Sequence, residues 1–552
     1  MIAWPTTMSM PGTKTAPSGG ARVALLVLAA AWLAWGPAAA PAQTFVVGLP
    51  AEPIQLDPAV AVDSASLQIT RQLYDTLVSL EGAPGEIRPA LAERWEASPD
   101  GRVWTFHLRR GIRFHDGTAL DAAAVVWNFE RWRRSDHPQH ANQVRAGRAF
   151  EYWASQFGGF DAAAVVQKVE ALGSHAVRLT LSSPLAPLLA SLAMPGFGIA
   201  SPAAVERWGT EFGRRPVGSG AFRLARWVPG QEVVLEANPG YWGVRPKVSR
   251  VVARPIKDNA RRLAALKAGE IHAMEGLNPD DVRAVAADPG LRLLLRPENN
   301  TGYLAFNYRV RAFQDRRVRL AFAHAIDRRA IVDALYGGTG LVATQFQPPS
   351  LWGHDAGLRD HEHSPEKARE LLRQAGFPNG LREISWDDGR REPLALWYMP
   401  VSRPYFPNPR EIAQAIAADL ARAGIVVRLE TVDWAVYLDR VKDGRLPLYM
   451  LGWIGDNGDP DNGLCYVFCA PGAAPQGFYV NRALADLLRR ARSLPARAER
   501  AALYRRAERL LHEDVARLFI AHNRTPLALA KGVTGYLPSL TGAEPYNTVE
   551  VE

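Results

Sequence analysis

Residues 408–453, NPREIAQAIAADLARAGIVVRLETVDWAVYLDRVKDGRLPLYMLGW, decide the fold class of this chain. Asn408 and Pro409 predict the start of a helix with one apolar face, which ends at Gly424. The apolar residues 425–432 that follow predict a buried strand. The chain therefore passes from a helix directly into a strand at this point.

The second half of this stretch repeats the alternation. Residues 434–442 predict another helix, and residues 446–453 predict another strand. Strands that follow helices in this way predict an α/β protein with a largely parallel sheet and helices on its faces. Ligands bind at the carboxyl ends of such strands, so the residues directly after Trp453 are the first place to expect a site.

Three further elements have clear local signals. Residues 44–49 and 103–109 predict short strands, because apolar and β-branched residues dominate them. Residues 364–376 predict a helix with Ser364 as its N-cap and Gly376 in a left-handed conformation at its end.

The composition is that of a large globular protein. The chain has 552 residues, of which 47% are hydrophobic and 22% charged, enough to form more than one lobe. Its 65 Lys and Arg residues exceed its 56 Asp and Glu residues, but they are scattered rather than gathered in runs. Nucleic-acid and lipid-binding patches have such runs, so we expect no nucleic-acid partner.

Residues 1–42 differ from the rest of the chain. Residues 23–35, VALLVLAAAWLAW, form an apolar stretch that is short for a membrane span, and Ala40-Pro41-Ala42 is a small-residue cleavage site. This pattern predicts a secretory signal peptide and an exported mature protein that begins at Gln43. A retained N-terminal anchor is the alternative.

The sequence has two cysteines, Cys465 and Cys469. In an oxidising compartment they could form a disulfide, but their spacing on a regular helix orients the two sulfurs poorly, so the sequence leaves this bridge open. Two cysteines are also too few ligands for a structural zinc site, and we expect neither a metal nor another cofactor.

Residues 91–132, LAERWEASPDGRVWTFHLRRGIRFHDGTALDAAAVVWNFERW, resemble the signature of the peptide and nickel binding proteins that serve ABC importers. Within that family, residues 396–408 (LWYMPVSRPYFPN) and 452–462 (GWIGDNGDPDN) are similar to the dipeptide-binding branch, and these motifs are more specific than the general signature. Shorter matches extend the resemblance over nearly the whole mature chain: PVGSGAFRL (216–224), NPGYWG (238–243), VRLAFAHAIDR (318–328) and AGFPNG (375–380).

The resemblance implies an α/β fold with two lobes, a periplasmic binding protein of type II (cluster C) with an extra inserted subdomain. Lobe I is expected from residues 43–302 and 524–552, with the subdomain inserted at about 81–215, and lobe II from residues 303–523. The resemblance further implies a monomeric, non-enzymatic receptor that captures small peptides and delivers them to the permease subunits of an ABC importer in the inner membrane. A dipeptide is the first expectation for the ligand.

Two residues are the main candidates for holding a dipeptide. A zwitterion buried in a closed pocket needs one acid and one base in fixed places, because an uncompensated buried charge is costly. In the dipeptide-binding relatives an Asp meets the ammonium and an Arg meets the carboxylate, and the matching residues here are Asp456 and Arg403. An ionised Asp accepts hydrogen bonds from an ammonium, and a guanidinium binds a carboxylate with two parallel hydrogen bonds.

Five more residues are expected near the ligand: Tyr405 and Trp453 as pocket walls, Gly455, and Asp63 and Ser64 from a loop of the first lobe. Ordinary core packing is the alternative role for the two aromatic residues. The other two acids of the 452–462 motif, Asp459 and Asp461, are expected only to form the turn, since Asp, Asn, Gly and Pro favour turns.

Two other kinds of function stay open. A secreted peptidase is the enzymatic alternative, but the sequence contains no HExxH, GxSxG or GxxxxGK[ST] motif. Another ligand, such as glutathione, haem or a nickel complex, is the alternative among binding proteins. The histidines at 354, 361 and 363 lie among acidic residues and have the pattern of a solvated loop rather than of a metal site.

Overall fold

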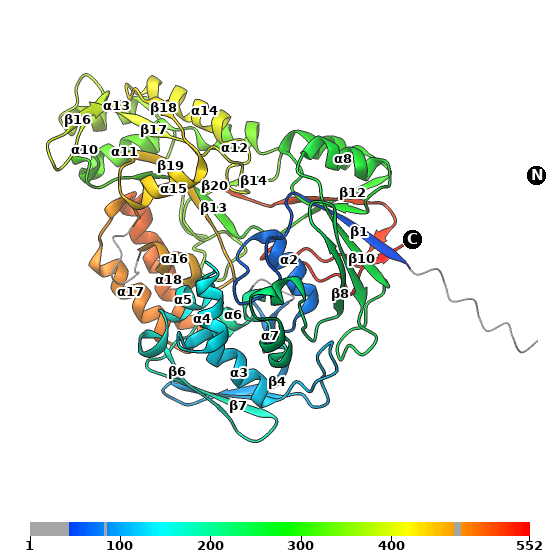
Figure 1. Cartoon of the computed structure of the whole chain (residues 1–552). Coiled ribbons are helices and arrows are strands. Elements are labelled where there is room, and N and C mark those ends of the chain that lie inside the picture. Colours follow the sequence, from blue (N-terminus) through cyan, green and yellow to red (C-terminus); the bar gives the residue numbers. More distant parts are fainter. Residues whose placement is uncertain (1–42, 82–84, 469–475) are drawn as a thin grey trace, which may run out of the picture. The chain divides into compact units, whose positions relative to one another are not determined.

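The computed structural model describes residues 43–81, 85–468 and 476–552 (Figure 1). The predicted signal peptide, residues 1–42, lies outside the described residues, as does Cys469. Residues 43–552 form one unit. None of the described helices combines the length and the apolar character that crossing a membrane requires.

The first large sheet has seven strands and is built from both ends of residues 43–552. Its strand order is β12 (Leu291–Leu295), β21 (Pro526–Ala530), β11 (Ala273–Met274), β1 (Thr44–Leu49), β10 (Arg250–Pro255), β9 (Glu232–Ala237) and β8 (Phe222–Val228). Strand β1 runs parallel to β10 and β11, whereas the other neighbours are antiparallel. The predicted strand at 44–49 is confirmed.

The second large sheet has six strands and was predicted only in part. Its strand order is β14 (Gly340–Val342), β20 (Arg517–Asn523), β13 (Asn300–Phe306), β19 (Leu448–Ile454), β17 (Ala395–Trp397) and β18 (Arg428–Glu430). Only β17, β18 and β19 pair in parallel, so the prediction of a largely parallel sheet is wrong. The reason is that β13 brings the chain in from the first sheet and the adjacent β20 takes it back, so these two strands run in opposite directions.

The stretch 408–453 forms the predicted elements with one correction. Helices α14 (Pro409–Arg422) and α15 (Trp434–Lys442) and strand β19 are confirmed. The expected buried strand 425–432 is reduced to the three residues of β18, and Val426 before it is 42% exposed. Strand β18 is the edge of its sheet and has one neighbouring strand, although Val427, Leu429 and Val432 still pack against the core.

Ten further helices lie between residues 64 and 468 of the chain: α2 (Ser64–Leu73), α6 (Leu188–Leu192), α7 (Pro202–Trp208), α8 (Asn259–Lys267), α9 (Val282–Ala287), α10 (Arg311–Gln314), α11 (Arg316–Ala325), α12 (Arg328–Leu335), α13 (Pro365–Gln374) and α16 (Asp461–Phe468). Two long helices follow, α17 (Arg482–Ser493) and α18 (Arg497–Asp514). Helix α13 confirms its local signals, because the Ser364 hydroxyl accepts a hydrogen bond from the Lys367 amide at 3.2 Å and Gly376 has a φ of 90°.

A third, smaller sheet belongs to a subdomain inserted between β1 and β8. Its four antiparallel strands are β4 (Ala92–Ala97), β5 (Val103–Leu108), β7 (Ala176–Leu181) and β6 (Val166–Ala171). They share a core with α3 (Ala122–Arg133) and α5 (Glu151–Phe157), in which Phe129, Trp132 and Trp153 are buried. Helix α4 (Pro138–Arg145) packs beside this core through His140, whose ring stacks on Phe150. Strand β5 confirms the strand predicted at 103–109.

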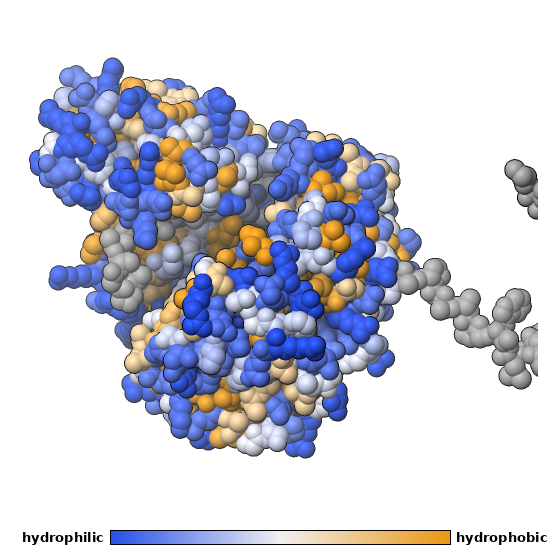
Figure 2. Space-filling view, viewed as in Figure 1, coloured by the Kyte–Doolittle hydropathy of each residue, from blue (hydrophilic) through white to orange (hydrophobic). Residues whose placement is uncertain are grey.

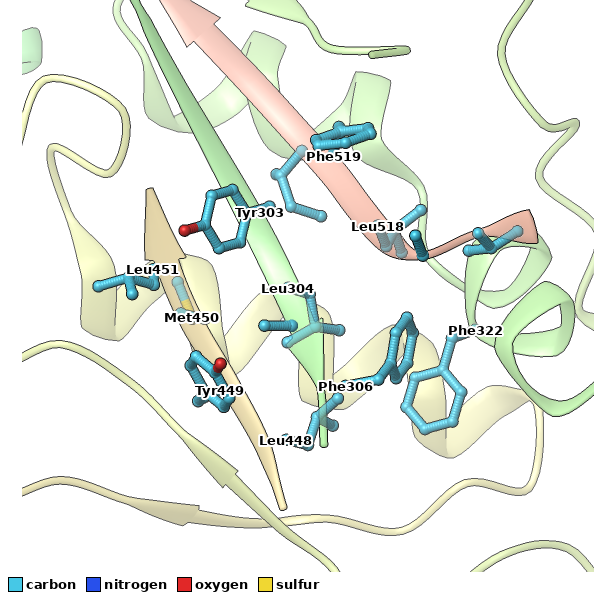
Figure 3. Close-up of a cluster of buried hydrophobic side chains, with 14 of the residues drawn as sticks. Tyr303, Leu304, Phe306, Phe322, Leu448, Tyr449, Met450, Leu451, Leu518 and Phe519 are labelled. Carbon is cyan, nitrogen blue, oxygen red and sulfur yellow. The ribbon is translucent and has the colours of Figure 1, made fainter. Parts of the chain in front are cut away.

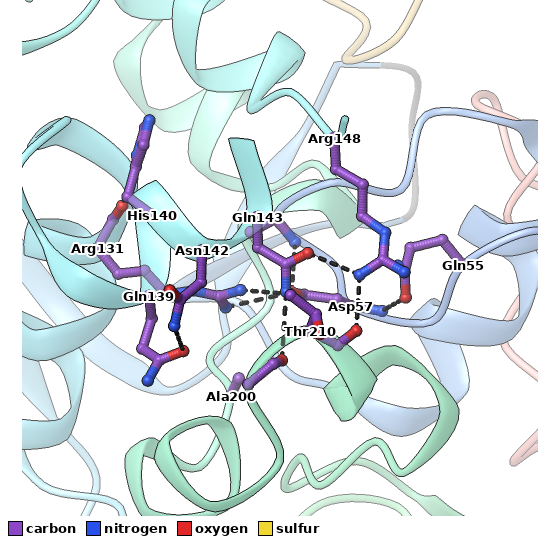
Figure 4. A network of polar contacts seen from close by, with 12 residues as sticks. Gln55, Asp57, Arg131, Gln139, His140, Asn142, Gln143, Arg148, Ala200 and Thr210 are labelled. Carbon is purple, nitrogen blue, oxygen red and sulfur yellow. Dashed lines mark hydrogen bonds and ion pairs between the residues drawn. The ribbon is translucent and has the colours of Figure 1, made fainter. Parts of the chain in front are cut away.

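A buried ion pair ties this subdomain to the first lobe (Figure 4). Asp57, which follows β1, receives hydrogen bonds on both carboxylate oxygens from Arg131 of α3, and both side chains are fully buried. Gln143 of α4 and the backbone amide of Ala59 donate to the same carboxylate, at 3.4 and 3.2 Å. The charge of Asp57 is therefore matched entirely from within the protein.

The two large sheets have separate hydrophobic cores. In the second sheet, side chains of β13, β19 and β20 interlock with helix residues such as Phe322 (Figure 3). The chain passes between the sheets twice, through residues 296–299 and residues 524–525. The lobe boundaries at 302/303 and 523/524 stay predictions beside these two crossings.

Candidate ligand-binding site

The site is built at the carboxyl end of β19, next to a crossing between the sheets. After Ile454, the amide of Gly455 donates to the backbone oxygen of Asn299 at 2.7 Å, and the Asn299 side chain donates to the oxygen of Gly455 at 2.7 Å. A Cβ on Gly455 would lie 2.3 Å from the Asn299 side chain, so only glycine allows this close approach. The turn that carries Asp456 is thus fixed to the crossing segment 296–299.

Asp456 is a half-buried carboxylate without a basic partner among the described residues. Its backbone amide donates to Oδ1 of Asn462 at 3.0 Å, and the Trp453 indole donates to the same oxygen at 3.2 Å. Burial raises the pKa of Asp456 to about 6, and the neighbouring polar groups of Asn462 and Tyr152 act in the opposite direction. Such a carboxylate is prepared to receive a positive charge from outside the protein.

The neighbouring acid Asp459, unlike Asp456, has a basic partner in the structure. Both of its oxygens accept hydrogen bonds from Arg500 at 2.8 and 2.6 Å, and both side chains are buried. Asp459 also accepts a hydrogen bond from the amide of Asp461 at 2.9 Å, as expected for a turn residue. The expectation that Asp459 only forms the turn is therefore incomplete, because it is also half of a buried ion pair.

Three cavities meet at Asp456. The large cavity, about 840 Å³, lies between Trp453 and Tyr466 on one side and Val62 and Tyr152 on the other. A second cavity of about 340 Å³ and a small cavity of about 180 Å³ also have Asp456 in their walls. Figure 2 shows a hollow near the middle of one face of the molecule, with apolar residues on its walls.

Arg403 lies at the same end of the second sheet but does not touch Asp456. Its guanidinium is 5.2 Å from the centre of the Trp434 ring. The backbone oxygen of Pro404 accepts a hydrogen bond from Asn523, the last residue of β20, at 2.8 Å. Asn523 is hydrogen-bonded in turn to Asn300, which pairs with the end of β19. Arg403 does not line any of the three cavities around Asp456.

The two predicted wall residues lie on opposite sides of β19. Tyr405 is 4% exposed, and a Cβ on Gly452 would lie 2.4 Å from its ring, so this ring covers Gly452. Trp453 lies beside Tyr466 at 4.8 Å between ring centres and lines the large cavity. Trp453 is thus placed at the cavities, whereas Tyr405 supports the turn that carries Arg403.

The loop of the first lobe contributes unequally. The Asp63 carboxylate accepts a hydrogen bond from the amide of Ser66 at 2.9 Å and caps α2, which is a structural role. Ser64 lines the small cavity together with Gly455 and Asp456. The structure therefore brings Asp456, Trp453, Gly455 and Ser64 together around the cavities.

The family follows from comparison with known proteins. A model of the bacterial extracellular solute-binding proteins, family 5 Middle, matches residues 86–474, which is more than half of the chain. The chain belongs to this family. The dipeptide-binding protein of Escherichia coli K12 is 34% identical over 496 residues, 87% of this chain and 89% of that protein. Heme-binding protein A of Haemophilus influenzae is 32% identical over 524 residues, 92% of each chain.

A solved structure of the same family confirms the fold. The ABC transporter-associated periplasmic binding protein DppA from Helicobacter pylori, in complex with peptide STSA, has 30% identity and a TM-score of 0.77 over 92% of this chain and 98% of that chain. The expected two-lobed α/β fold of periplasmic binding proteins is therefore confirmed. The relatives are named as binding proteins, so this family 5 member is a solute-binding protein rather than an enzyme.

Tyr152 is a site residue that the sequence analysis missed. It comes from α5 of the inserted subdomain, and its hydroxyl donates to Asp456; burial, together with the charge of Asp456, raises the pKa of Tyr152. No local pattern marks this tyrosine, since its partner lies in another part of the chain. Asn462 was also missed, although it belongs to the quoted motif 452–462 and could have been found there.

The histidines and the cysteines near these elements have other roles in the structure. Rings of His361 and His512 stack at 4.5 Å, and burial lowers the pKa of His361 to about 3. Within the described ranges, no group of His, Cys, Asp and Glu side chains is arranged to hold a metal ion. Cys465 is not a free thiol, while its predicted partner Cys469 lies outside the described residues, so this pairing stays a prediction.

Proposed function

We propose that this solute-binding protein captures small peptides with a free amino terminus, dipeptides first, in the periplasm, and delivers them to the permease subunits of an ABC importer. One observation carries the proposal: Asp456 is a half-buried carboxylate with no basic partner among the described residues, in the wall of three cavities. A peptide ammonium would supply the missing charge and would replace the water lost when the lobes close.

Arg403 is the proposed partner of the peptide carboxylate. It lies at the same end of the second sheet as Asp456, and its guanidinium makes no ion pair with a described carboxylate. The planar guanidinium of Arg403, 5.2 Å from the centre of the Trp434 ring, can bind a carboxylate with two parallel hydrogen bonds. The relatives named for dipeptide binding support this assignment.

Haem is the second candidate ligand, since one relative is named heme-binding protein A and the large cavity of about 840 Å³ exceeds what a dipeptide needs. Isothermal titration of the mature protein with Ala-Leu, its N-acetylated and C-amidated forms, a tetrapeptide, glutathione, haem and Ni²⁺ separates the candidates. We expect micromolar or tighter binding of Ala-Leu and a large loss on acetylation. Equal affinity for the free and acetylated peptides would overturn the role of Asp456 and the peptide assignment with it.

A further inference from the structure

The large cavity carries more negative charge than a peptide ammonium needs. Three carboxylates line it, Glu151, Asp456 and Asp461, against one guanidinium, Arg492, which leaves two negative charges. One of these charges is assigned to the peptide ammonium at Asp456. The other has no counterpart in a dipeptide whose side chains are neutral.

Asp461 is buried in the wall of this cavity with an unused oxygen. Its side chain is 5% exposed, and Oδ1 has no hydrogen-bond partner. Its other oxygen, Oδ2, lies 3.6 Å from Nε of Arg492. A carboxylate in such a place is normally fully paired, as Asp459 is by Arg500 two residues earlier. Oδ1 has almost no accessible surface, so Asp461 acts on a cation in this cavity through its charge and not through a hydrogen bond to Oδ1.

Arg492 does not cancel this charge alone, because its guanidinium is shared among several acceptors. One of its nitrogens donates to the backbone oxygen of Gln156 at 3.2 Å, and another lies 3.7 Å from the sulfur of Cys465. Glu151, in the first turn of α5, is exposed at the cavity and forms no ion pair with a described residue. Its carboxylate is thus available to a ligand without the loss of an existing contact.

The remaining walls suit a long, flexible cation. Tyr152, Trp453 and Tyr466 present aromatic surface to the large cavity, and the rings of Trp453 and Tyr466 lie 4.8 Å apart with a tilt of 36°. Aliphatic stems of Lys and Arg side chains pack on such surface while their charged ends reach a carboxylate. Gly158 and Gly159 contribute only backbone to the wall of this cavity.

We infer that the large cavity is a subsite for the cationic side chain of the peptide's first residue, Lys or Arg, with Glu151 and Asp461 as the residues that determine this specificity. The inference rests on the proposed function, because it needs the peptide ammonium at Asp456 to direct the first side chain into the large cavity. The substrate class is therefore small peptides with a basic first residue.

The test compares two dipeptides of nearly equal shape, Lys-Ala and norleucine-Ala, by isothermal titration at neutral pH. For the unmodified mature protein we expect Lys-Ala to bind about tenfold more tightly. In Glu151→Gln this ratio falls several-fold, in Asp461→Asn it falls by a smaller factor because Asp461 acts without direct contact, and norleucine-Ala keeps its affinity in both. Glu411→Gln is the matched control, because Glu411 lies in the first turn of α14 and away from the cavities; it should leave the ratio unchanged.

The outcomes separate the inference from the proposed function. If both peptides bind with the same affinity, or if the substitutions weaken both equally, the cationic subsite is wrong while peptide binding stands. If neither peptide binds, the proposed function fails and the subsite fails with it. Circular dichroism of Asp461→Asn checks that this variant folds. If it does not fold, the comparison of the two peptides in Glu151→Gln decides, because Glu151 is exposed.

Discussion

Two carboxylates of this protein, Asp57 and Asp456, differ in the partners that surround them. Asp57 is fully buried and receives both of its charge-matching hydrogen bonds from Arg131, with Gln143 and a backbone amide completing its shell (Figure 4). Asp456 receives only hydrogen bonds from neutral groups, and burial raises its pKa to about 6. Among the described residues, Asp57 has a basic partner and Asp456 has none.

The difference separates a structural charge from a binding charge. A buried ion pair whose partners are both in the protein contributes to holding elements together, and removing one partner strands the other in a dry environment. A carboxylate without such a partner keeps the folded protein less stable than it could be. A ligand that supplies a positive charge would explain why the unpaired carboxylate of Asp456 lies where three cavities meet.

The largest effect should appear in the free energy of unfolding. Asp57→Ala leaves the Arg131 charge buried and unpaired, so we expect a loss of about 3–5 kcal/mol in chemical denaturation. Asp456→Ala removes an uncompensated charge, so at neutral pH it should leave the same free energy unchanged or raise it. Comparable losses in the two variants would erase the distinction between them.

Ligand affinity should show the reverse order. Asp456→Ala and Arg403→Ala should each weaken Ala-Leu binding by about 2–5 kcal/mol, because each strands one charge of the bound zwitterion. For a receptor of micromolar affinity, with about 8 kcal/mol of binding free energy, this loss removes measurable binding in a calorimetric titration.

Blocked peptides give the control for direct contact. Acetylation of the amino group should cost the unmodified protein much affinity but Asp456→Ala little more, and amidation of the carboxylate should have the same relation to Arg403→Ala. If instead each variant loses affinity for all peptides alike, the residue supports the turn and does not contact the ligand.

Elements with complete local signals were predictable from the sequence. Strand β1, helix α13 and helix α15 carry their caps and periodicity within a few residues, and all three were predicted. The strand directions of the second sheet were not, because β13 and β20 pair across more than two hundred residues of chain. The edge position of β18 is also a long-range fact, invisible in the apolar run 425–432.

The site divides along the same line. Asp456, Gly455 and Trp453 lie in one motif at a strand end, so the sequence could place them at the cavities. Tyr152 reaches Asp456 from the inserted subdomain, and the charge match between Asp459 and Arg500 joins a turn to a distant helix. Contacts of this kind depend on how the lobes fold up, which no local pattern records.

A smaller effect concerns pH. The pKa of Asp456 is raised from its ordinary value of 3.8 to about 6 by burial, and only the ionised form attracts a peptide ammonium. Below about pH 6 the Kd for Ala-Leu should therefore rise about tenfold per pH unit, with proton release on binding.

The free energy of unfolding should also depend on the protonation of Asp456. Because the folded state holds this proton more tightly than the unfolded state, Asp456→Asn should gain stability relative to the unmodified protein as pH rises from about 4 to 6, and gain no more above pH 6. Titrations and denaturation curves across this range measure both slopes, and a flat Kd would contradict the assignment.

The smallest effect should come from Tyr152, which donates a hydrogen bond to Asp456 from the inserted subdomain. An ionised carboxylate can accept several hydrogen bonds, so the hydroxyl and a peptide ammonium can be bound at the same time. Tyr152→Phe should then weaken Ala-Leu binding by about 0.5–1.5 kcal/mol and move the acid limb of the pH profile upward, since the hydroxyl lowers the pKa of Asp456. Tyr466→Phe removes a hydroxyl from the same large cavity without touching Asp456 and should change neither quantity. Tighter binding in Tyr152→Phe would mean that the hydroxyl competes with the ammonium for Asp456. The protein itself would then supply part of the hydrogen bonding of Asp456, as it does for Asp57, and the contrast between the two carboxylates would be wrong.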